Sequence, residues 1–413
     1  MLTFRPDMSL RPLLLSAACA VALGAPAAAR AEPGDDLTIS MLTFGPGDHP
    51  FFKFGHNAIW VQPRDGQGLV FNFGTFAFDQ PNLIPKFLKG RLMYWLSVSP
   101  EKASLRSYQA TNRTIEIQEL DLTPAEREGL YRRLLDNARP EHREYLYDYF
   151  WDNCSTRVRD AIDVTIGGRL KAAGQGPASM SLRANALRMT SDLLWEYVGL
   201  HFGLGSLTDR PMTRWQEAFL PEKLRDLLRT IRVDGEGGPR PLVKSERVIF
   251  AANRPPQPAQ APHWAPWFAL CGLAVGGALA LLGLAARRHA AARVALGALA
   301  SLLGLVLGLL GLILLLLWLF TNHKAAHANA NILQCAPFAV ALAPLGIGVA
   351  LGWAGARRIA YQIAAAAAVL ALVGVVAKVL PGVTQDNTAF LLLFVPLWLG
   401  LAFALRQVVP ARS

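Results

Sequence analysis

Five apolar runs dominate the chain from residue 264 onward. They lie near residues 264–286, 294–320, 336–356, 359–380 and 389–405. A helix needs about 20 mainly apolar residues to cross roughly 30 Å of hydrocarbon, and each run reaches or nearly reaches that length. In lipid the backbone must satisfy its own hydrogen bonds, which restricts such runs to helices. The sequence therefore predicts a bundle of five transmembrane helices within residues 264–413.

The charged residues between the runs predict the orientation of this bundle. Alternate loops carry the arginines, namely Arg287, Arg288 and Arg293, then Arg357 and Arg358, then Arg406 and Arg412. Basic residues in short loops favour the cytoplasmic side of a membrane. The loops at 321–335 and 381–388 then face outward. We therefore expect a multi-pass protein of the bacterial inner membrane with its N-terminal domain in the periplasm.

Residues 1–31 have the layout of a secretory signal peptide. Two arginines precede an apolar run over residues 13–24, and small residues follow up to Ala31. This pattern predicts cleavage after Ala31. A first transmembrane helix is the alternative, although the run is short and Pro26 interrupts its end. Cys19 has no leucine three positions before it, so we predict no lipidation.

The charge distribution excludes a nucleic acid as the partner. The chain has a formal net charge of +11, but Glu32–Pro262 carries 29 Lys and Arg against 28 Asp and Glu. The excess lies in loops between apolar runs, so it reports membrane topology. We predict an exported domain over residues 32–253, a Pro-rich linker over 254–263 and the transmembrane domain after it.

Cys154 is the only cysteine of the predicted exported domain. Cys271 and Cys335 lie within or at the edge of predicted spans. A thiol without a partner in an oxidising compartment is a liability unless it is buried or used. Cys154 is therefore the first candidate for chemistry, and packing as a small apolar residue is the alternative.

The residues around Cys154 predict that it begins a helix. Asp152 or Asn153 supplies an N-cap, an apolar stripe follows, and a glycine pair ends the helix. In the first turn, free backbone N–H groups and the positive end of the helix dipole favour a thiolate, which is the nucleophilic form. Arg157 and Arg159, which are close in sequence, favour the same interpretation.

His56 is the candidate base. It precedes an apolar run that indicates a buried strand, and residues 69–74 are the expected hairpin partner. A histidine at a strand start can face a cysteine at a helix N-terminus, and Asn72 on the partner strand can orient the imidazole. Asn57 and Asp148 are the other candidates for that orienting role. Each histidine taken alone is more often a surface or structural residue; the others are His49, His142, His201 and, at the border, His263.

Three sequence blocks are specific enough to compare with known families. They are Phe54-Gly55-His56-Asn57-Ala58, Phe71-Asn72-Phe73-Gly74-Thr75-Phe76 and Tyr147-Asp148-Tyr149-Phe150-Trp151-Asp152-Asn153-Cys154-Ser155-Thr156-Arg157. These blocks resemble the exported domain of the Lnb-type lipoprotein transacylase family. The resemblance continues into the membrane half, through Thr321-Asn322-His323 and Asn329-Ala330-Asn331-Ile332-Leu333, and covers most of the mature chain. One position departs, because Asn322 stands where we expect an acidic residue.

The resemblance implies a fold and a reaction. The order of histidine before cysteine is similar to circularly permuted papain-like folds, so we expect an α+β exported domain of that kind, followed by a five-helix transmembrane α bundle. The implied reaction moves the sn-2 acyl chain of a diacylglyceryl-cysteine in a lipoprotein to the α-amino group, which leaves a lyso-form. Cys154 would attack the ester and hold the acyl group as a thioester, while His56 would take and return protons.

The expected site has two sets of residues. The catalytic set is Cys154, His56 and Asn72, with backbone N–H groups at the helix start to bind the oxyanion. The substrate-binding set is Asn57, Asp148, Asn153 and His323. The partner would be a lipoprotein or phospholipid in the membrane. No metal-ligand spacing is visible in the sequence, so we expect no metal and no cofactor.

Two other functions stay open at this point. An exported cysteine peptidase or amidase would keep its activity after removal of residues 263–413. A non-enzymatic membrane protein whose exported domain binds a partner would tolerate the loss of Cys154 and His56.

Several further segments lead to expectations about packing. Thr123–Asn137 has a capping box and predicts a helix, as does Pro221–Ile231. The aromatic residues within 71–96 favour core packing over an acyl-chain groove. The basic residues Lys86, Lys89 and Arg91 favour a solvated face over contact with headgroups. The polar loop 323–331 favours solvent-exposed filler over a place beside the active site.

Overall fold

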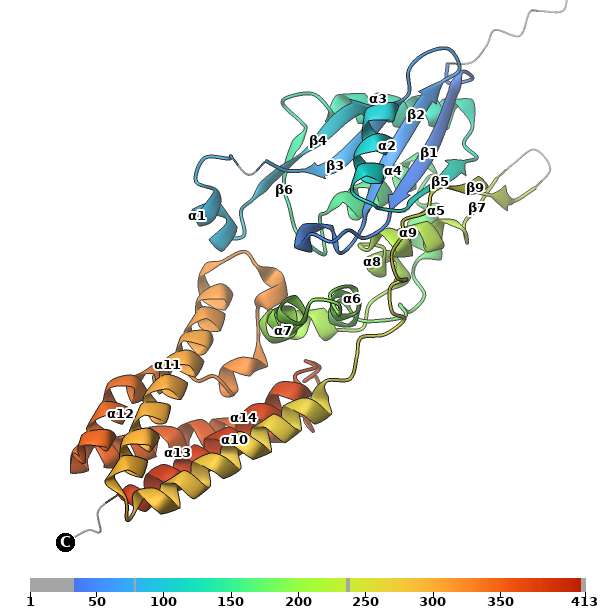
Figure 1. The fold of residues 1–413 in the computed structure, drawn as a ribbon. Coiled ribbons are helices and arrows are strands. Elements are labelled where there is room, and N and C mark those ends of the chain that lie inside the picture. Colours follow the sequence, from blue (N-terminus) through green and yellow to red (C-terminus); the bar gives the residue numbers. More distant parts are fainter. Residues whose placement is uncertain (1–32, 78, 235–237, 410–413) are drawn as a thin grey trace, which may run out of the picture.

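The structure is a computed structural model that describes residues 33–77, 79–234 and 238–409. The predicted signal peptide and Cys19 lie outside these residues. Figure 1 shows an α+β domain at one end of the molecule and a bundle of long helices at the other. The α+β class of the N-terminal domain and the helical C-terminal domain are both as predicted.

A seven-stranded antiparallel sheet is the frame of the N-terminal domain. In spatial order its strands are β6 (Glu144–Leu146), β4 (Met93–Pro100), β3 (Leu69–Thr75), β2 (His56–Pro63), β1 (Leu37–Phe44), β5 (Ile115–Leu120) and β9 (Val243–Phe250). β2 pairs with β3 so that Ile59 lies opposite Phe71, which confirms the predicted hairpin. The central strands are apolar on both faces because helices cover both sides of the sheet.

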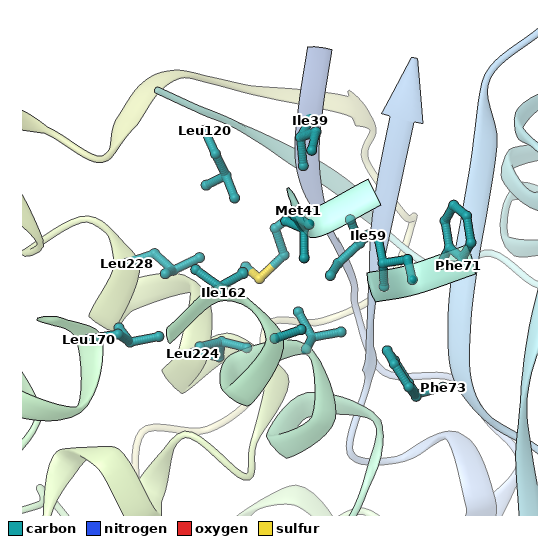
Figure 2. Close-up of a cluster of buried hydrophobic side chains, with 14 of the residues drawn as sticks. Ile39, Met41, Ile59, Phe71, Phe73, Leu120, Ile162, Leu170, Leu224 and Leu228 are labelled. Atoms are coloured by element: carbon teal, nitrogen blue, oxygen red, sulfur yellow. The ribbon is translucent and has the colours of Figure 1, made fainter. Parts of the chain in front are cut away.

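Three helices cover one face of the sheet. They are α3 (Pro124–Asn137), α4 (Cys154–Thr165) and α9 (Pro221–Leu228). Figure 2 shows the core between them and the sheet, where Met41 and Ile59 meet Ile162 of α4 and Leu228 of α9. α3 has the predicted capping box on Thr123, and α9 ends three residues before the predicted Ile231.

The other face of the sheet is covered by α2 (Glu101–Ala110). Leu105 and Tyr108 of α2 pack against alternate residues of the same strands, including Phe44 and Trp60. Because successive side chains of a strand point to opposite faces, β1 and β2 contribute to both cores. The site residues of β2 and β3 are therefore held between two packed layers.

A helical lobe follows α4 and lies between the sheet and the membrane helices in Figure 1. It contains α5 (Arg169–Ala173), α6 (Leu182–Met189), α7 (Leu194–Gly203), a 3-10 turn at Ser206–Asp209 and α8 (Arg214–Glu217). After α9, the short strands β7 (Arg232–Val233) and β8 (Arg240–Pro241) pair with each other. An ion pair of Arg183 with Asp209 at 2.9 Å holds the lobe together, with side-chain exposures of 1% and 5%. The Arg183 guanidinium also donates to the backbone carbonyls of His201, Leu204 and Gly205.

Among the described residues, five helical segments are long and apolar enough to span a membrane, as predicted. They are α10 (Ala265–Ala286), α11 (Ala290–Phe320), the segment Ala330–Leu351, α13 (Ala354–Ala377) and α14 (Thr388–Val408). The third is irregular, because 3-10 turns at Ala330–Leu333 and Pro337–Ala341 precede a short α12 (Leu342–Leu351). Pro337 lacks a backbone N–H, and the irregular backbone is tolerated because Cys335 and Ala339 pack inside the bundle.

The outward loop 321–335 differs from its expectation as solvent-exposed filler. Asn329 and Asn331 are fully buried and donate hydrogen bonds to the carbonyl groups at the end of α7. Gln385 of the second outward loop binds Asn329 at 2.9 Å. The reason is that carbonyl groups at a helix C-terminus lack intrahelical partners, and these amides supply them. The loop therefore docks the N-terminal domain onto the membrane helices.

Candidate active site

A cavity of about 1250 Å³ lies between the sheet, the helical lobe and the outward loop. Its wall includes His56, Asn72 and Cys154, and it extends to Leu317 in the last turn of α11. Ordinary small-molecule pockets measure roughly 300–1,000 Å³, so this space suits a larger and elongated ligand. The cavity thus joins the predicted catalytic residues to a membrane-spanning helix.

Cys154 is the first residue of α4, as predicted. Asn153 is the N-cap: its side-chain oxygen accepts from the backbone N–H of Thr156 at 2.9 Å, and the Thr156 hydroxyl accepts from the Asn153 backbone N–H at 2.7 Å. The Asn153 amide also donates to the carbonyls of Tyr149 and Phe219. These bonds fix the start of the helix, and with it the position of the thiol.

The Cys154 thiol lies in a buried setting that has several donors. Burial raises its pKa, while the backbone N–H groups of Asn57, Ser155 and Cys154 itself and the positive charge of Arg113 lower it. The balance leaves the pKa above its usual value, so the thiol is protonated at rest. The same N–H groups are available to stabilise negative charge on sulfur or on an attacked carbonyl oxygen.

Gly74 of β3 makes room for this thiol. Its φ of +85° lies in the left-handed region, and a Cβ placed on it would lie 3.4 Å from the Cβ of Cys154 and 3.7 Å from the Tyr145 hydroxyl. A side chain there would adopt a strained backbone and touch the cysteine. The turn at Gly74 therefore sets how closely β3 approaches α4.

His56 is the first residue of β2 and lines the same cavity as Cys154. It stacks against Phe44 and Tyr108, with ring centroids 6.0 Å apart in both pairs. Burial and the charge of Arg113 lower the pKa of His56 to about 3, while the Asn72 side chain acts in the opposite direction. The imidazole is therefore neutral at physiological pH and available as a base.

Asn72 and Asn57 occupy different places around His56. Asn72 lines the cavity, and its side chain raises the pKa of His56. No hydrogen bond of ordinary length joins the two side chains. Asn72 Oδ1 and His56 Nε2 also have no other hydrogen-bond partner among the described residues. Asn57 is fully buried, donates to Leu42 O and Thr43 Oγ1, and accepts from the Ser155 hydroxyl at 2.8 Å. The Asn57 side chain thus ties β1 and β2 to α4 and does not line the cavity.

Arg113 and Tyr108 were missed by the sequence analysis. Arg113 is buried at the cavity wall, donates to Gly45 O at 2.8 Å and lies over the rings of Phe52 and Tyr108 at 5.1 and 4.8 Å. The sequence around them shows no motif. They come close to His56 only through the pairing of β1 with β5 and the packing of α2, which a local sequence pattern does not reveal. They are the charge and the ring that set the surroundings of the imidazole.

Arg157 and Arg159 do not have the role that their sequence positions suggested. Arg157 pairs with Asp152 at 2.5 Å and lies over the Tyr145 ring, and Arg159 pairs with Asp160. A helix turns about 100° per residue, so neighbours in sequence point in different directions. The cation that acts on the thiol is Arg113.

The remaining predicted substrate-binding residues lie at the cavity. Asp148 lines it, and its carboxylate accepts from the backbone N–H groups of Phe150 and Trp151 at 3.1 and 3.2 Å. Asn153 also borders the cavity, although its side chain is engaged in capping. His323 reaches it from the outward loop, donates to Phe87 O at 2.8 Å and stacks on Tyr149. The loop therefore lies beside the candidate site, which was the less favoured expectation.

The cavity wall has a polar part and an apolar part. Ser97 and Ser99 of β4 and Ser104 and Ser107 of α2 line it with hydroxyl groups. Aromatic and aliphatic side chains line the rest of the wall, and these include Phe51, Phe52, Phe54, Phe76, Phe87, Leu88, Trp195, Leu200 and Leu317. The expectation that the aromatic residues within 71–96 serve the core is correct for Phe73. Phe76 packs against this core and also lines the cavity. The expectation is wrong for Phe87, which is exposed and borders the cavity.

The described residues around the cavity form no metal site. Within residues 33–77, 79–234 and 238–409, no group of three His, Cys, Asp or Glu side chains is arranged to hold a metal ion. His142 lies at the surface beside Asp136, and His201 contacts the carbonyl of Asp386 near the membrane helices. Among the described residues, the cavity wall contains the thiol of Cys154 and the imidazoles of His56, His49 and His323.

Comparison with known families now adds to this geometry. Residues 26–186 match the Lnb N-terminal periplasmic domain, and residues 264–409 match the Lnb transmembrane domain. The chain belongs to the Lnb family. It is a multi-pass membrane protein whose N-terminal domain is periplasmic, which agrees with the arginine pattern of the loops. Comparison with curated proteins and with solved structures gave no match.

Proposed function

We propose that this Lnb-family protein is a membrane-anchored thiol acyltransferase that moves an acyl chain from an ester to the N-terminal amine of a lipoprotein and leaves a lyso-form. The observation that carries the proposal is the shared cavity of Cys154 and His56, which continues to Leu317 of a membrane-spanning helix. A substrate that is anchored in the bilayer by its acyl chains needs such a path. The histidine-then-cysteine order on a strand and a helix start also fits a permuted papain-like arrangement.

In the first step the Cys154 thiol attacks the ester carbonyl. Sγ forms the new C–S bond as its proton passes to neutral His56, and the carbonyl electron pair moves onto oxygen. Backbone N–H groups at the start of α4 stabilise this oxyanion. The ester C–O bond then breaks, His56 protonates the departing alkoxide, and the products are a lyso-lipoprotein and a thioester on Cys154.

In the second step the α-amine of the lipoprotein attacks the thioester. The new C–N bond forms, the C–S bond breaks, and His56 carries the amine proton to the departing thiolate. The products are an amide and the free Cys154 thiol, so the cycle needs no cofactor. Arg113 beside the site disfavours a positively charged amine and favours its neutral, nucleophilic form.

The polar wall of the cavity fits the head of such a substrate. The four serine hydroxyls lie on the side of β4 and α2, where a glycerol or peptide group can hydrogen-bond. The aromatic and aliphatic side chains of the wall fit acyl chains, because each buried methylene contributes about 0.8 kcal/mol. Asn72 would orient His56, and Asp148 and His323 would contact the substrate beside the site.

The experiment that tests the proposal uses a reporter lipoprotein in a host without its own N-acylating enzyme. The intact protein should convert the free-amine diacyl form into an isomer with one acyl chain on nitrogen, measured by mass spectrometry of the N-terminal lipopeptide. Cys154→Ala should abolish the conversion, and Cys271→Ala, which removes an exposed thiol of α10, should leave it unchanged.

Two results would contradict the proposal. If Cys154→Ala converts the reporter as the intact protein does, the thiol is not the nucleophile. If neither protein converts it while both are folded and inserted, a peptidase or a partner-binding function becomes the better interpretation. A peptidase would then show activity in the isolated N-terminal domain.

A further inference from the structure

The short helix α1 (Leu83–Leu88) exposes an apolar surface next to the cavity. Ile84 is 70% exposed and Leu88 59% exposed, and Phe87 beside them is also exposed. Side chains of this kind on the outside of a soluble domain are unfavourable in water when they cluster. The surface formed by Ile84, Phe87 and Leu88 is called here the α1 apolar surface.

Backbone contacts fix α1 at the outer end of a membrane span. The Asn322 backbone N–H donates to Lys89 O at 2.9 Å, and His323 donates to Phe87 O at 2.8 Å. Asn322 is the second residue after Phe320, where the apolar helix α11 ends. In Figure 1, α1 lies directly beyond that end of α11. The α1 apolar surface is therefore continuous with the lipid-facing surface of the span.

Positive charge accompanies this apolar surface. Lys86, Lys89 and Arg91 lie on or next to α1, and no ion pair of these three with an acidic side chain is present among the described residues. Basic side chains beside exposed apolar ones are typical of segments that lie in the headgroup layer of an anionic membrane. The expectation of a solvated face is compatible with the exposure of Lys89 and Arg91, and the neighbouring apolar side chains add contact with headgroups as a second possibility to test.

Exposed apolar residues of α7 form a second apolar edge of the cavity. Leu194 and Trp195 of α7 are exposed, and Trp195 lines the cavity together with Phe87 and Leu88 of α1. Leu317 of α11 lines it three residues before the span ends, at about 4.5 Å of helix rise. The cavity wall therefore reaches below the end of the span, between two apolar edges.

We propose that α1 inserts into the outer leaflet of the membrane and that α1 and α7 form the two sides of a lateral opening through which an acyl chain enters the cavity from the lipid. The occupant of the α1 apolar surface is then the lipid of the same membrane. The assignment of the opening to an acyl substrate depends on the proposed function, whereas the insertion of α1 does not.

The first test measures the depth of α1 without using activity. The full-length chain carrying Cys154→Ala, Cys271→Ala and Ile84→Cys is labelled with bimane and placed in phosphatidylcholine–phosphatidylglycerol vesicles with lipids brominated near the glycerol. Val248→Cys on β9 is the control, because it is a similarly exposed apolar residue at 59% on the far edge strand. We expect quenching of the label at position 84 and almost none at 248. Equal quenching at both positions would overturn the insertion of α1.

The second test separates entry from chemistry. Ile84→Asp should lower the rate on a vesicle-embedded lipopeptide about tenfold, because a carboxylate is unfavourable at that depth, and should leave the rate on a short water-soluble ester unchanged. Val248→Asp should change neither rate. An equal loss on both substrates would mean that Ile84 supports the fold and would overturn lateral entry. Quenching at position 84 together with inactivity of the unaltered protein on the lipopeptide would refute the proposed function and leave the insertion of α1 standing.

Discussion

Substituting Gly74 by alanine tests the contact between β3 and the cysteine. Gly74 has a φ of +85°, and the left-handed region costs an L-residue about 1–2 kcal/mol. The added Cβ would lie at ordinary contact, 3.4 Å, from the Cβ of Cys154, so the strain is conformational and not a steric overlap. For a domain of this size, that free energy lowers the unfolding temperature by roughly 2–8 °C.

Relaxation of that strain would also move β3 against α4. A displacement of 1 Å at reacting groups can reduce a rate about 100-fold, so a shift of a few tenths of an ångström should reduce it about threefold to tenfold. The rate of Cys154 alkylation by iodoacetamide and the transacylation rate report this displacement. Tryptophan fluorescence during heating reports the unfolding temperature.

Gly167 provides a matched control for the backbone term. Its φ is +66°, and nothing lies within 4 Å of an added Cβ. Gly167→Ala should therefore lower the unfolding temperature by a similar amount and leave the alkylation of Cys154 unchanged. Equal effects of the two substitutions on alkylation would refute the local role of Gly74. An unchanged unfolding temperature in Gly74→Ala would refute the strain argument itself.

Three other predictions follow from contacts described above. Because the pKa of His56 is lowered to about 3 and that of Cys154 is raised, the base is neutral from about pH 4 upward. Release of the lyso-form in the first step should therefore be about as fast at pH 5 as at pH 7 in a single-turnover assay. Alkylation of Cys154 should increase with pH without a plateau between 5 and 8, whereas such a plateau would indicate a thiolate–imidazolium pair. Arg183→Met leaves Asp209 as a buried, unpaired charge and should destabilise the lobe by about 3–5 kcal/mol, seen as a lower unfolding temperature; a change within error would show that the pair is dispensable. Asn329→Ala removes three hydrogen bonds to the carbonyl groups at the end of α7 and should speed amide hydrogen exchange in the outward loop. Alkylation of Cys154 should stay the same. Unchanged hydrogen exchange would contradict the docking role of this amide.

Local sequence signals predicted the elements that carry the candidate catalytic residues. The cap at Asn153 and the apolar stripe after it predicted the start of α4, and two neighbouring apolar runs predicted the pairing of β2 with β3. The spans were predicted because hydrophobic length alone determines them. In each case the signal lies within about twenty consecutive residues.

Contacts between distant segments could not be predicted in the same way. Arg113 acts on the thiol because β5 pairs with β1. The sequence of neither strand shows which strands will be neighbours in the sheet. The burial of Asn329 depends on carbonyl groups of α7, more than a hundred residues away in sequence. The sequence of a polar loop between two spans does not show whether the loop is solvent-exposed or buried. Side-chain amides can donate hydrogen bonds to water or to buried carbonyl groups.

The docking of Asn329 and Gln385 onto α7 has a consequence for the height of the reaction centre. Because these amides join α7 of the periplasmic domain to both outward loops, contacts within the protein hold Cys154 at a set height relative to the membrane spans. The glycerol layer of a lipid moves outward as the bilayer thickens, while the thiol keeps its height. Under the proposed function, membrane thickness would determine which carbonyl group of a lipid lies next to the sulfur. The acyl-chain length of the host lipid would then affect the proposed transfer without any contact at the site.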